Sequence, residues 1–144
     1  MIKLFIIFTI CLLGFVASAD PEPDSDMNYK LKKKVMNVAE KCKIKVNATD
    51  DDLKQLMNGS PNKSYAANCL NSCVMKDLNV VDSKWNFVRS GVLDYIKQYT
   101  NNDKNLIEFS ITLFDVCNNR TKREYKDCDD YAEYQKCITE QLTK

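Results

Sequence analysis

The side chains best suited to chemistry in this chain are its cysteines, two of which, Cys69 and Cys73, stand four residues apart. Residues at this spacing share one face of a helix, because each residue turns the helix by about 100°. That face can offer two sulfur atoms to two other segments, and a disulfide requires Cβ atoms about 4 Å apart. A zinc site would need four ligands, yet the chain has no histidine and no second closely spaced cysteine pair. The pair therefore predicts cross-links rather than a metal site.

The N-terminus gives a reason for these cysteines to be oxidised. Residues 4–16 are almost wholly apolar and precede Ala17, Ser18 and Ala19, a pattern typical of a secretory signal peptide cut after Ala19. The run is shorter than the ~20 residues that a membrane-spanning helix needs. We expect residues 1–19 to be removed, and residues 20–144 to form one extracellular domain. Cleavage would remove Cys11 and leave six of the seven cysteines, which can pair in 15 ways.

Charge and composition exclude several functional classes. The chain has 21 basic and 20 acidic side chains, so neither nucleic acid nor an anionic membrane is expected as the main partner. Without histidine there is no Ser-His or Cys-His catalytic pair. The acidic runs at 50–52 and 129–130 are typical of solvated helix starts, and no glycine-rich phosphate loop or helix-loop-helix calcium loop is present. We expect no enzymatic activity, cofactor or metal.

The apolar pattern, together with only three glycines and three prolines, predicts an all-α fold of about six helices. The first ends near Lys43, and the second follows Thr49 as N-cap, with acidic residues in its first turn. Further helices are expected over about 63–78, 85–99, 106–117 and from about 124 onward. On the last, Cys128 and Cys137 would lie about 180° apart, so that neighbours hold the helix from both flanks. The apolar face of the first helix comprises Leu31, Val35, Val38 and Cys42.

The helices expected over 85–99 and 106–117 carry more large apolar side chains than a thin helical shell needs. This surplus is compatible with a filled core and with a cavity. Three cross-links, each worth about 3–4 kcal/mol in the chain-entropy estimate, would allow a small domain to tolerate an incompletely filled interior. The apolar pattern alone leaves both alternatives open.

The order of the six cysteines, Cys42-x26-Cys69-x3-Cys73-x43-Cys117-x10-Cys128-x8-Cys137, resembles that of the six-cysteine insect odorant-binding proteins. The x3 and x8 gaps are the most constant features of that family. The resemblance implies a compact bundle of about six helices around an apolar cavity. It also implies three interlocked disulfides, Cys42–Cys73, Cys69–Cys128 and Cys117–Cys137.

The resemblance implies that the chain is a secreted carrier. Members of that family bind small hydrophobic molecules such as odorants and pheromones in an internal pocket and carry them through aqueous fluid to membrane receptors. A monomer or weak homodimer is expected. Polar groups that could orient a ligand are Tyr65, Tyr95, Tyr131 and Ser110. The candidate pocket residues are Leu56, Leu70, Val74, Trp85, Val88, Val92, Ile96, Leu106, Phe109, Leu113, Phe114 and Tyr131.

Two departures from the family qualify this expectation. Without histidine, release of ligand in acid would require carboxyl groups with raised pKa values. The tail after Cys137 has only residues 138–144, too few for a long segment that enters the pocket. The competing hypothesis is a disulfide-stabilised helical protein with a filled core, acting through its surface on a protein or membrane. The run Lys32–Lys34 is the one local feature that favours it.

Overall fold

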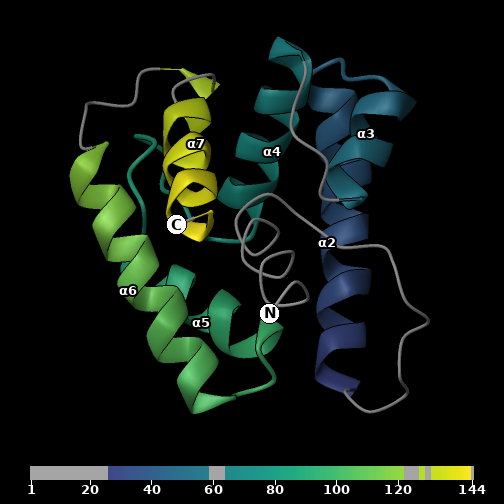
Figure 1. The fold of residues 1–144 in the computed structure, drawn as a ribbon. Coiled ribbons are helices and arrows are strands. Elements are labelled where there is room, and N and C mark those ends of the chain that lie inside the picture. Colours follow the sequence, from purple (N-terminus) through teal and green to yellow (C-terminus); the bar gives the residue numbers. More distant parts are fainter. Residues whose placement is uncertain (1–25, 59–63, 122–126, 129–130, 144) are drawn as a thin grey trace.

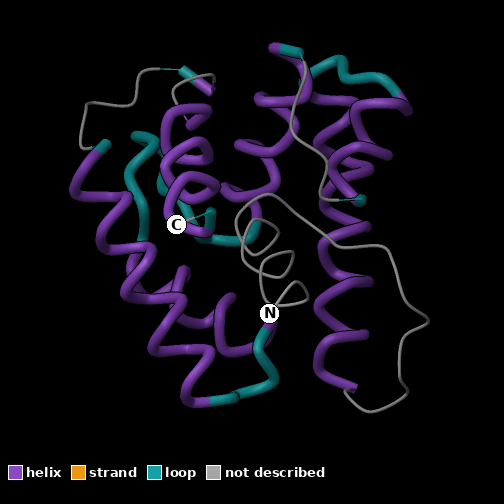
Figure 2. The backbone as a smooth tube through the Cα atoms, viewed as in Figure 1, coloured by secondary structure: helices purple, strands orange, loops and turns teal. Residues whose placement is uncertain are grey.

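The computed structural model describes residues 26–58, 64–121, 127–128 and 131–143, so the expected signal peptide lies outside the described residues. Six helices account for most of the described chain, which confirms the predicted all-α class (Figures 1 and 2). None of the described helices is long and apolar enough to cross a membrane. Their bounds are α2 Asp26–Lys45, α3 Asp50–Met57, α4 Tyr65–Asp77, α5 Arg89–Tyr99, α6 Lys104–Arg120 and α7 Tyr131–Leu142.

Five of these helices form a closed ring of contacts. α2 packs on α4, α4 on α7, α7 on α6, α6 on α5, and α5 returns to α2. Figure 1 shows α7 lying between α4 and α6, with α5 below them. α3 packs outside the ring against both α2 and α4. The ring gives each of its helices an inward face, and the buried apolar side chains collect there.

The inward face of α2 follows the expected helical period with one change. Leu31, Val35 and Cys42 are buried as predicted, but Ala39 is fully buried and Val38 only half-buried. A small side chain at position 39 permits close approach of the neighbouring helix, and α2 continues two residues beyond the predicted end. Asn47 then adopts a positive φ of 55°, which asparagine tolerates better than most residues.

The starts of α3 and α4 are tied together by one carboxylate. Thr49 caps α3 by accepting from the Asp52 N–H at 3.1 Å, while Asp52 Oδ2 accepts from the Thr49 N–H at 2.8 Å, forming a capping box. Asp52 Oδ1 also accepts from Ser64 Oγ at 2.9 Å. Ser64 in turn caps α4 by accepting from the Ala67 N–H at 3.0 Å. The predicted N-cap at Thr49 is confirmed, and its hydrogen-bond network continues through Asp52 to Ser64, the N-cap of α4.

The chain between α4 and α5 forms a tight turn where the sequence pattern predicted a helix from residue 85. Val81 and Phe87 form an antiparallel bridge, and the Val88 N–H donates to Val80 O at 2.8 Å. This pairing fixes Phe87 and Val88 before the helix begins at Arg89. Both side chains are apolar, which is why they fit a helical pattern in the sequence. In the structure they belong to an extended segment that pairs with residues 80–81.

The tip of this turn is held by a side chain that competes with helix formation. Asp82 Oδ1 accepts from the backbone N–H groups of Lys84 and Asn86 at 2.8 and 2.9 Å. Trp85, between them, has a positive φ of 67°, which no residue inside a helix adopts. The Lys76 ammonium lies 3.4 Å from the centre of the indole ring, a cation–π contact that holds the ring against α4.

The C-terminal part also differs from prediction. α6 extends to Arg120 and includes residues expected in a loop. The described Asp127 and Cys128 precede α7, so Cys128 and Cys137 do not share one helix, and the argument from their 180° separation does not apply. Ser72 Oγ of α4 donates to Cys128 O at 3.1 Å, which ties the segment before α7 to α4.

Three disulfides connect these elements: Cys42–Cys73, Cys69–Cys128 and Cys117–Cys137. They are the three pairs that the family resemblance implies. The first joins α2 to α4, the second joins α4 to the segment before α7, and the third joins α6 to α7. The disulfides therefore cross-link three successive contacts of the ring: α2 with α4, α4 with the segment before α7, and α7 with α6.

Candidate functional site

Aromatic rings pack against one another between the 80–88 turn, α6 and α7. Phe87 contacts three of them, with centroid distances of 5.1 Å to Phe114, 5.5 Å to Tyr131 and 4.8 Å to Tyr134. Trp85 lies 6.2 Å from Tyr131, whose hydroxyl donates to Trp85 O. Aromatic side chains provide large apolar area with few internal rotations, which suits the lining of a site for apolar molecules.

Most of the predicted pocket residues are buried or half-buried. Half-buried positions are Trp85, Val88 and Leu106. Fully buried positions are Leu56, Leu70, Val74, Val92, Ile96, Leu113, Phe114 and Tyr131.

Phe109 differs from the other predicted pocket residues, because its side chain is 44% exposed on the outer side of α6. The inward positions of α6 are Ser110, Leu113, Phe114 and Cys117, which are spaced three, one and three residues apart. Phe109 lies next to this stripe but turned toward solvent. This corrects the expectation that Phe109 faces the interior.

A cleft of about 190 Å³ lies where α2 and the end of α4 meet α5. Its apolar lining is Leu31, Leu78 and Tyr95, while Lys34 and Asp94 bring charge to it. A cavity of about 150 Å³ holds a molecule of the size of benzene, so this cleft can accept a small molecule or part of a longer one. None of the predicted pocket residues borders it.

Gly91 fixes the shape of this cleft. A Cβ atom there would lie 1.8 Å from Asn79 O, so no other residue fits without a shift of the backbone. Asn79 itself has a positive φ of 62° at the end of α4. The sequence pattern gave no indication of this contact, because a lone glycine in the first turn of a helix is an ordinary feature.

The four polar side chains expected to orient a ligand lie in different places. Tyr65 is exposed, and its hydroxyl donates to Asp127 at 2.9 Å, which corrects the expectation that it faces a pocket. Tyr131 is buried but donates to a backbone carbonyl. Ser110 is buried on α6, and Tyr95 borders the cleft. The sequence reasoning missed Asn71, a buried amide on α4.

In the described part of the chain, three carboxyl groups have a displaced pKa, and each pKa is lowered. Hydrogen bonds from Thr49 lower the pKa of Asp52 despite its burial. Backbone donors lower the pKa of Asp82, and the Arg89 guanidinium lowers that of Asp115. A carboxylate that titrates below its ordinary range stays charged in mild acid. These three groups therefore do not provide the raised pKa that release of a ligand in acid would require.

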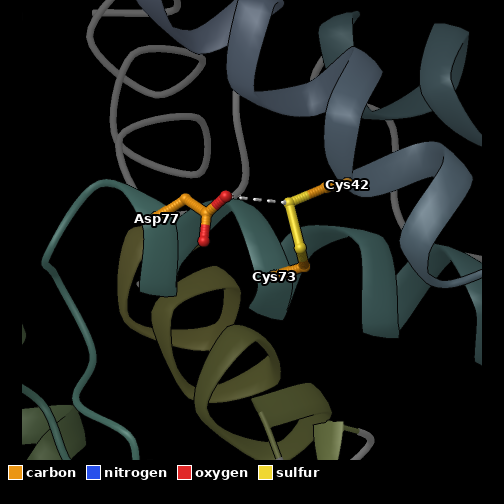
Figure 3. A group of neighbouring side chains, drawn as sticks. All are labelled: Cys42, Cys73 and Asp77. Atoms are coloured by element: carbon orange, nitrogen blue, oxygen red, sulfur yellow. Dashed lines mark hydrogen bonds between the residues drawn. A yellow bond between two sulfur atoms is a disulfide. The ribbon is translucent and has the colours of Figure 1, made fainter.

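Among the residues that the structure describes, two groups of side chains have the proximity of metal ligands, and both contain a disulfide. Figure 3 shows Cys42, Cys73 and Asp77, in which Asp77 Oδ2 lies 3.9 Å from Cys42 Sγ. A disulfide sulfur carries neither a proton to donate nor the thiolate charge that binds metals. Asp77 instead pairs with Lys45 Nζ at 3.3 Å. In the second group, Cys69 and Cys128 are likewise bonded to each other.

Comparisons with known proteins agree with this architecture. A family model described as PBP/GOBP matches residues 24–141. The general odorant-binding protein 28a of Drosophila melanogaster is 34% identical over 84 residues, which cover 58% of this chain and 59% of that protein, less than two thirds of its length. The general odorant-binding protein 19d of the same organism is 26% identical over 139 residues, 96% of this chain and 87% of that protein.

A solved structure extends the comparison to the fold. The odorant-binding protein 28a from Drosophila melanogaster superposes with a TM-score of 0.67 and 30% sequence identity, covering 82% of this chain and 96% of that one. The family model, the helical ring and the three disulfides lead to one conclusion: the chain belongs to the PBP/GOBP family, the insect odorant-binding proteins.

Proposed function

We propose that this protein is a secreted carrier that binds small hydrophobic molecules inside the helical ring and transports them through aqueous fluid to membrane receptors. The observation that carries the proposal is membership of the PBP/GOBP family over residues 24–141. The relatives in Drosophila melanogaster are named general odorant-binding proteins. The binding site, the route to a receptor and the absence of catalysis are parts of this proposal.

The physical basis for binding is the transfer of apolar surface out of water. A ligand gains roughly 25 cal/mol for each Å² of apolar surface that it buries, and no covalent bond changes. The aromatic rings around Phe87 and the buried side chains of α4, α5 and α6 offer the apolar lining. The cleft near Gly91 is the proposed route by which part of a ligand reaches solvent.

Secretion is part of the same proposal. The apolar residues 4–16 and the small residues 17–19 support cleavage after Ala19, and three disulfides suit an oxidising compartment. Expression of the full chain in insect cells should release a product that begins at Asp20. N-terminal sequencing of the medium checks this, and an intact N-terminus would contradict it.

The binding experiment uses oxidised, delipidated protein and an apolar fluorescent probe. We expect one saturable site per chain with micromolar affinity, displaced by long-chain alcohols, esters or terpenoids. Reduction of the disulfides should abolish binding, because the ring is no longer held closed. Lysozyme serves as a control for a small oxidised protein outside this family.

An absence of probe binding by folded, oxidised protein would overturn the carrier proposal. It would favour the alternative of a filled core and a protein that acts through its surface. The outer face of α2 would then be the first region to test, because it exposes Tyr29, Met36 and Ile44 beside several lysines.

A further inference from the structure

Residues 47–49, Asn-Ala-Thr, match the sequon Asn-x-Ser/Thr, the acceptor sequence for N-linked glycans on secreted chains. Residues 119–121, Asn-Arg-Thr, form a second sequon that the structure describes in full. The sequons that begin at Asn58 and Asn62 include residues outside the described ones. Such triplets arise by chance in a chain rich in asparagine, so the structure around each one has to separate a usable site from an incidental match.

The first sequon lies in the short connection between the end of α2 at Lys45 and the start of α3 at Asp50. Asn47 is exposed, and its side chain makes no hydrogen bond within the described part of the chain. Its backbone N–H donates to Ile44 O at 3.3 Å, while its positive φ of 55° turns the chain out of the helix. Its amide group is therefore presented to solvent on a surface loop, the position typical of a glycan acceptor.

The second sequon is taken up by secondary structure. Asn119 lies in the last turn of α6, and Thr121 is buried, with its hydroxyl donating to Cys117 O at 2.8 Å. Cys117 is joined to α7 by the disulfide to Cys137. Helices form within about a microsecond, so α6 withdraws this triplet from a surface-loop conformation early in folding. The two sequons thus have matching sequences but different accessibility.

Ile44 gives a glycan at Asn47 an apolar surface to cover. Its side chain is 80% exposed, the highest value among the large apolar side chains that the structure describes. A single exposed apolar side chain is ordinary on a protein surface. This one, however, lies in the same turn as the sequon asparagine, because Ile44 O accepts from the Asn47 N–H. A bulky, solubilising group on Asn47 therefore starts close to the Ile44 side chain.

We propose that Asn47 carries an N-linked glycan whose first sugars cover Ile44. The inference rests on the secretion proposed above, because the transferase that attaches such glycans acts in the secretory pathway. In this reaction Asn47 Nδ2 attacks the anomeric carbon of an oligosaccharide that is linked to a lipid diphosphate. The new bond joins this nitrogen to the sugar carbon, the bond from that carbon to the diphosphate oxygen breaks, the lipid diphosphate leaves, and the amide loses one proton.

Peptide mapping of the full chain secreted by insect cells tests the site directly. Trypsin cleaves after Lys45 and Lys54 and releases residues 46–54, in which Asn47 is the sole asparagine. We expect this peptide to carry added masses of N-acetylhexosamine and hexose, and Asn47→Asp to lose them. Aspartate is chosen because it also tolerates a positive φ. Asn119→Asp is the matched control, which should leave the glycan mass of the secreted chain unchanged.

Retention on a hydrophobic interaction column tests whether the glycan covers Ile44. Ile44→Ser is measured in the glycosylated wild type and in the unglycosylated Asn47→Asp protein. The substitution should shorten retention clearly in the unglycosylated protein and shift it little in the glycosylated one, because sugar already shields the isoleucine. The comparison of the two shifts cancels the direct effect of the aspartate charge on retention.

The outcomes separate this inference from the carrier function. A secreted wild-type chain with an unmodified peptide 46–54 would overturn the glycan at Asn47, and this result depends on no variant folding. Equal retention shifts for Ile44→Ser in both proteins would overturn the covering of Ile44. A chain kept inside the cell with its N-terminus intact would overturn secretion and the glycan together. Probe binding by Asn47→Asp should equal that of wild type, so a failure of probe binding in wild type concerns the carrier function alone.

Discussion

The two sides of the helical ring are held together by different interactions. α2, α3 and α4 are joined by hydrogen-bonded helix caps, in which Asp52 connects the starts of α3 and α4, and by Cys42–Cys73. The 80–88 turn, α6 and α7 are joined by packed aromatic rings around Phe87 and by Cys117–Cys137. Polar caps depend on residues close in sequence, whereas the aromatic cluster brings together residues distant in sequence.

This difference explains which side of the ring was predictable. The start of α3 follows from Thr49 and the aspartates after it, and the structure agrees with the prediction. The turn that carries Phe87 was mistaken for a helix, because its apolar residues match a helical period. Each side can therefore be destabilised separately by a substitution that removes its own kind of interaction.

The largest effect is expected from removal of a disulfide. Replacing both Cys42 and Cys73 by serine opens a loop with a sequence separation of 31, and replacing both Cys117 and Cys137 opens one of 20. The chain-entropy estimate gives about 3–4 kcal/mol for either, so the two sides should lose similar stability. Urea unfolding of both variants measures this, and an unchanged midpoint for either would contradict the cross-link's role.

Phe87→Ala should destabilise the aromatic side by about 3 kcal/mol, because a ring that contacts three others is removed. The chain has one tryptophan, and it stands two residues away, so its fluorescence reports on the same turn. Phe109→Ala is the control, since that side chain is 44% exposed and its removal should cost less. Equal losses for the two variants would argue against a packed cluster at Phe87.

Gly91→Ala tests the contact between α5 and the end of α4. The added Cβ would meet Asn79 O at 1.8 Å, which forces α5 away from the end of α4. Overpacking of this kind costs about 1–3 kcal/mol. Ser90→Ala, an exposed neighbour, should leave thermal stability unchanged. Equal unfolding temperatures for the two variants would show that the backbone contact yields easily.

Asp52→Asn should cost about 1 kcal/mol at neutral pH through weaker capping of α3 and α4. The pKa of Asp52 is lowered in the folded state, so its contribution is complete above the ordinary aspartate value of about 3.9 and falls as pH drops through the folded-state pKa. The stability difference between wild type and variant should therefore shrink in acid. Asp51→Asn, which alters an exposed carboxyl group, should show no such trend.

The sequence by itself determined the properties that depend on local chemistry. Apolar period, caps and scarce glycine predicted an all-α chain, and the cysteine spacing identified the family and implied its disulfides. These features act within a few residues or are shared by related chains. Helix ends were predicted less accurately, because contacts with neighbouring segments decide whether the last turn forms. α2 and α6 both extend beyond their predicted ends, to Lys45 and Arg120.

Only the tertiary structure decided which side chains meet. It placed Trp85 and Phe87 on a turn, turned Phe109 toward solvent, and set Gly91 against Asn79 O. It also placed the Asn71 amide among buried apolar neighbours without an acceptor for its Nδ2 donor. A side chain's type predicts whether burial is favourable. Its partners depend on how distant segments pack, which a helical period does not encode.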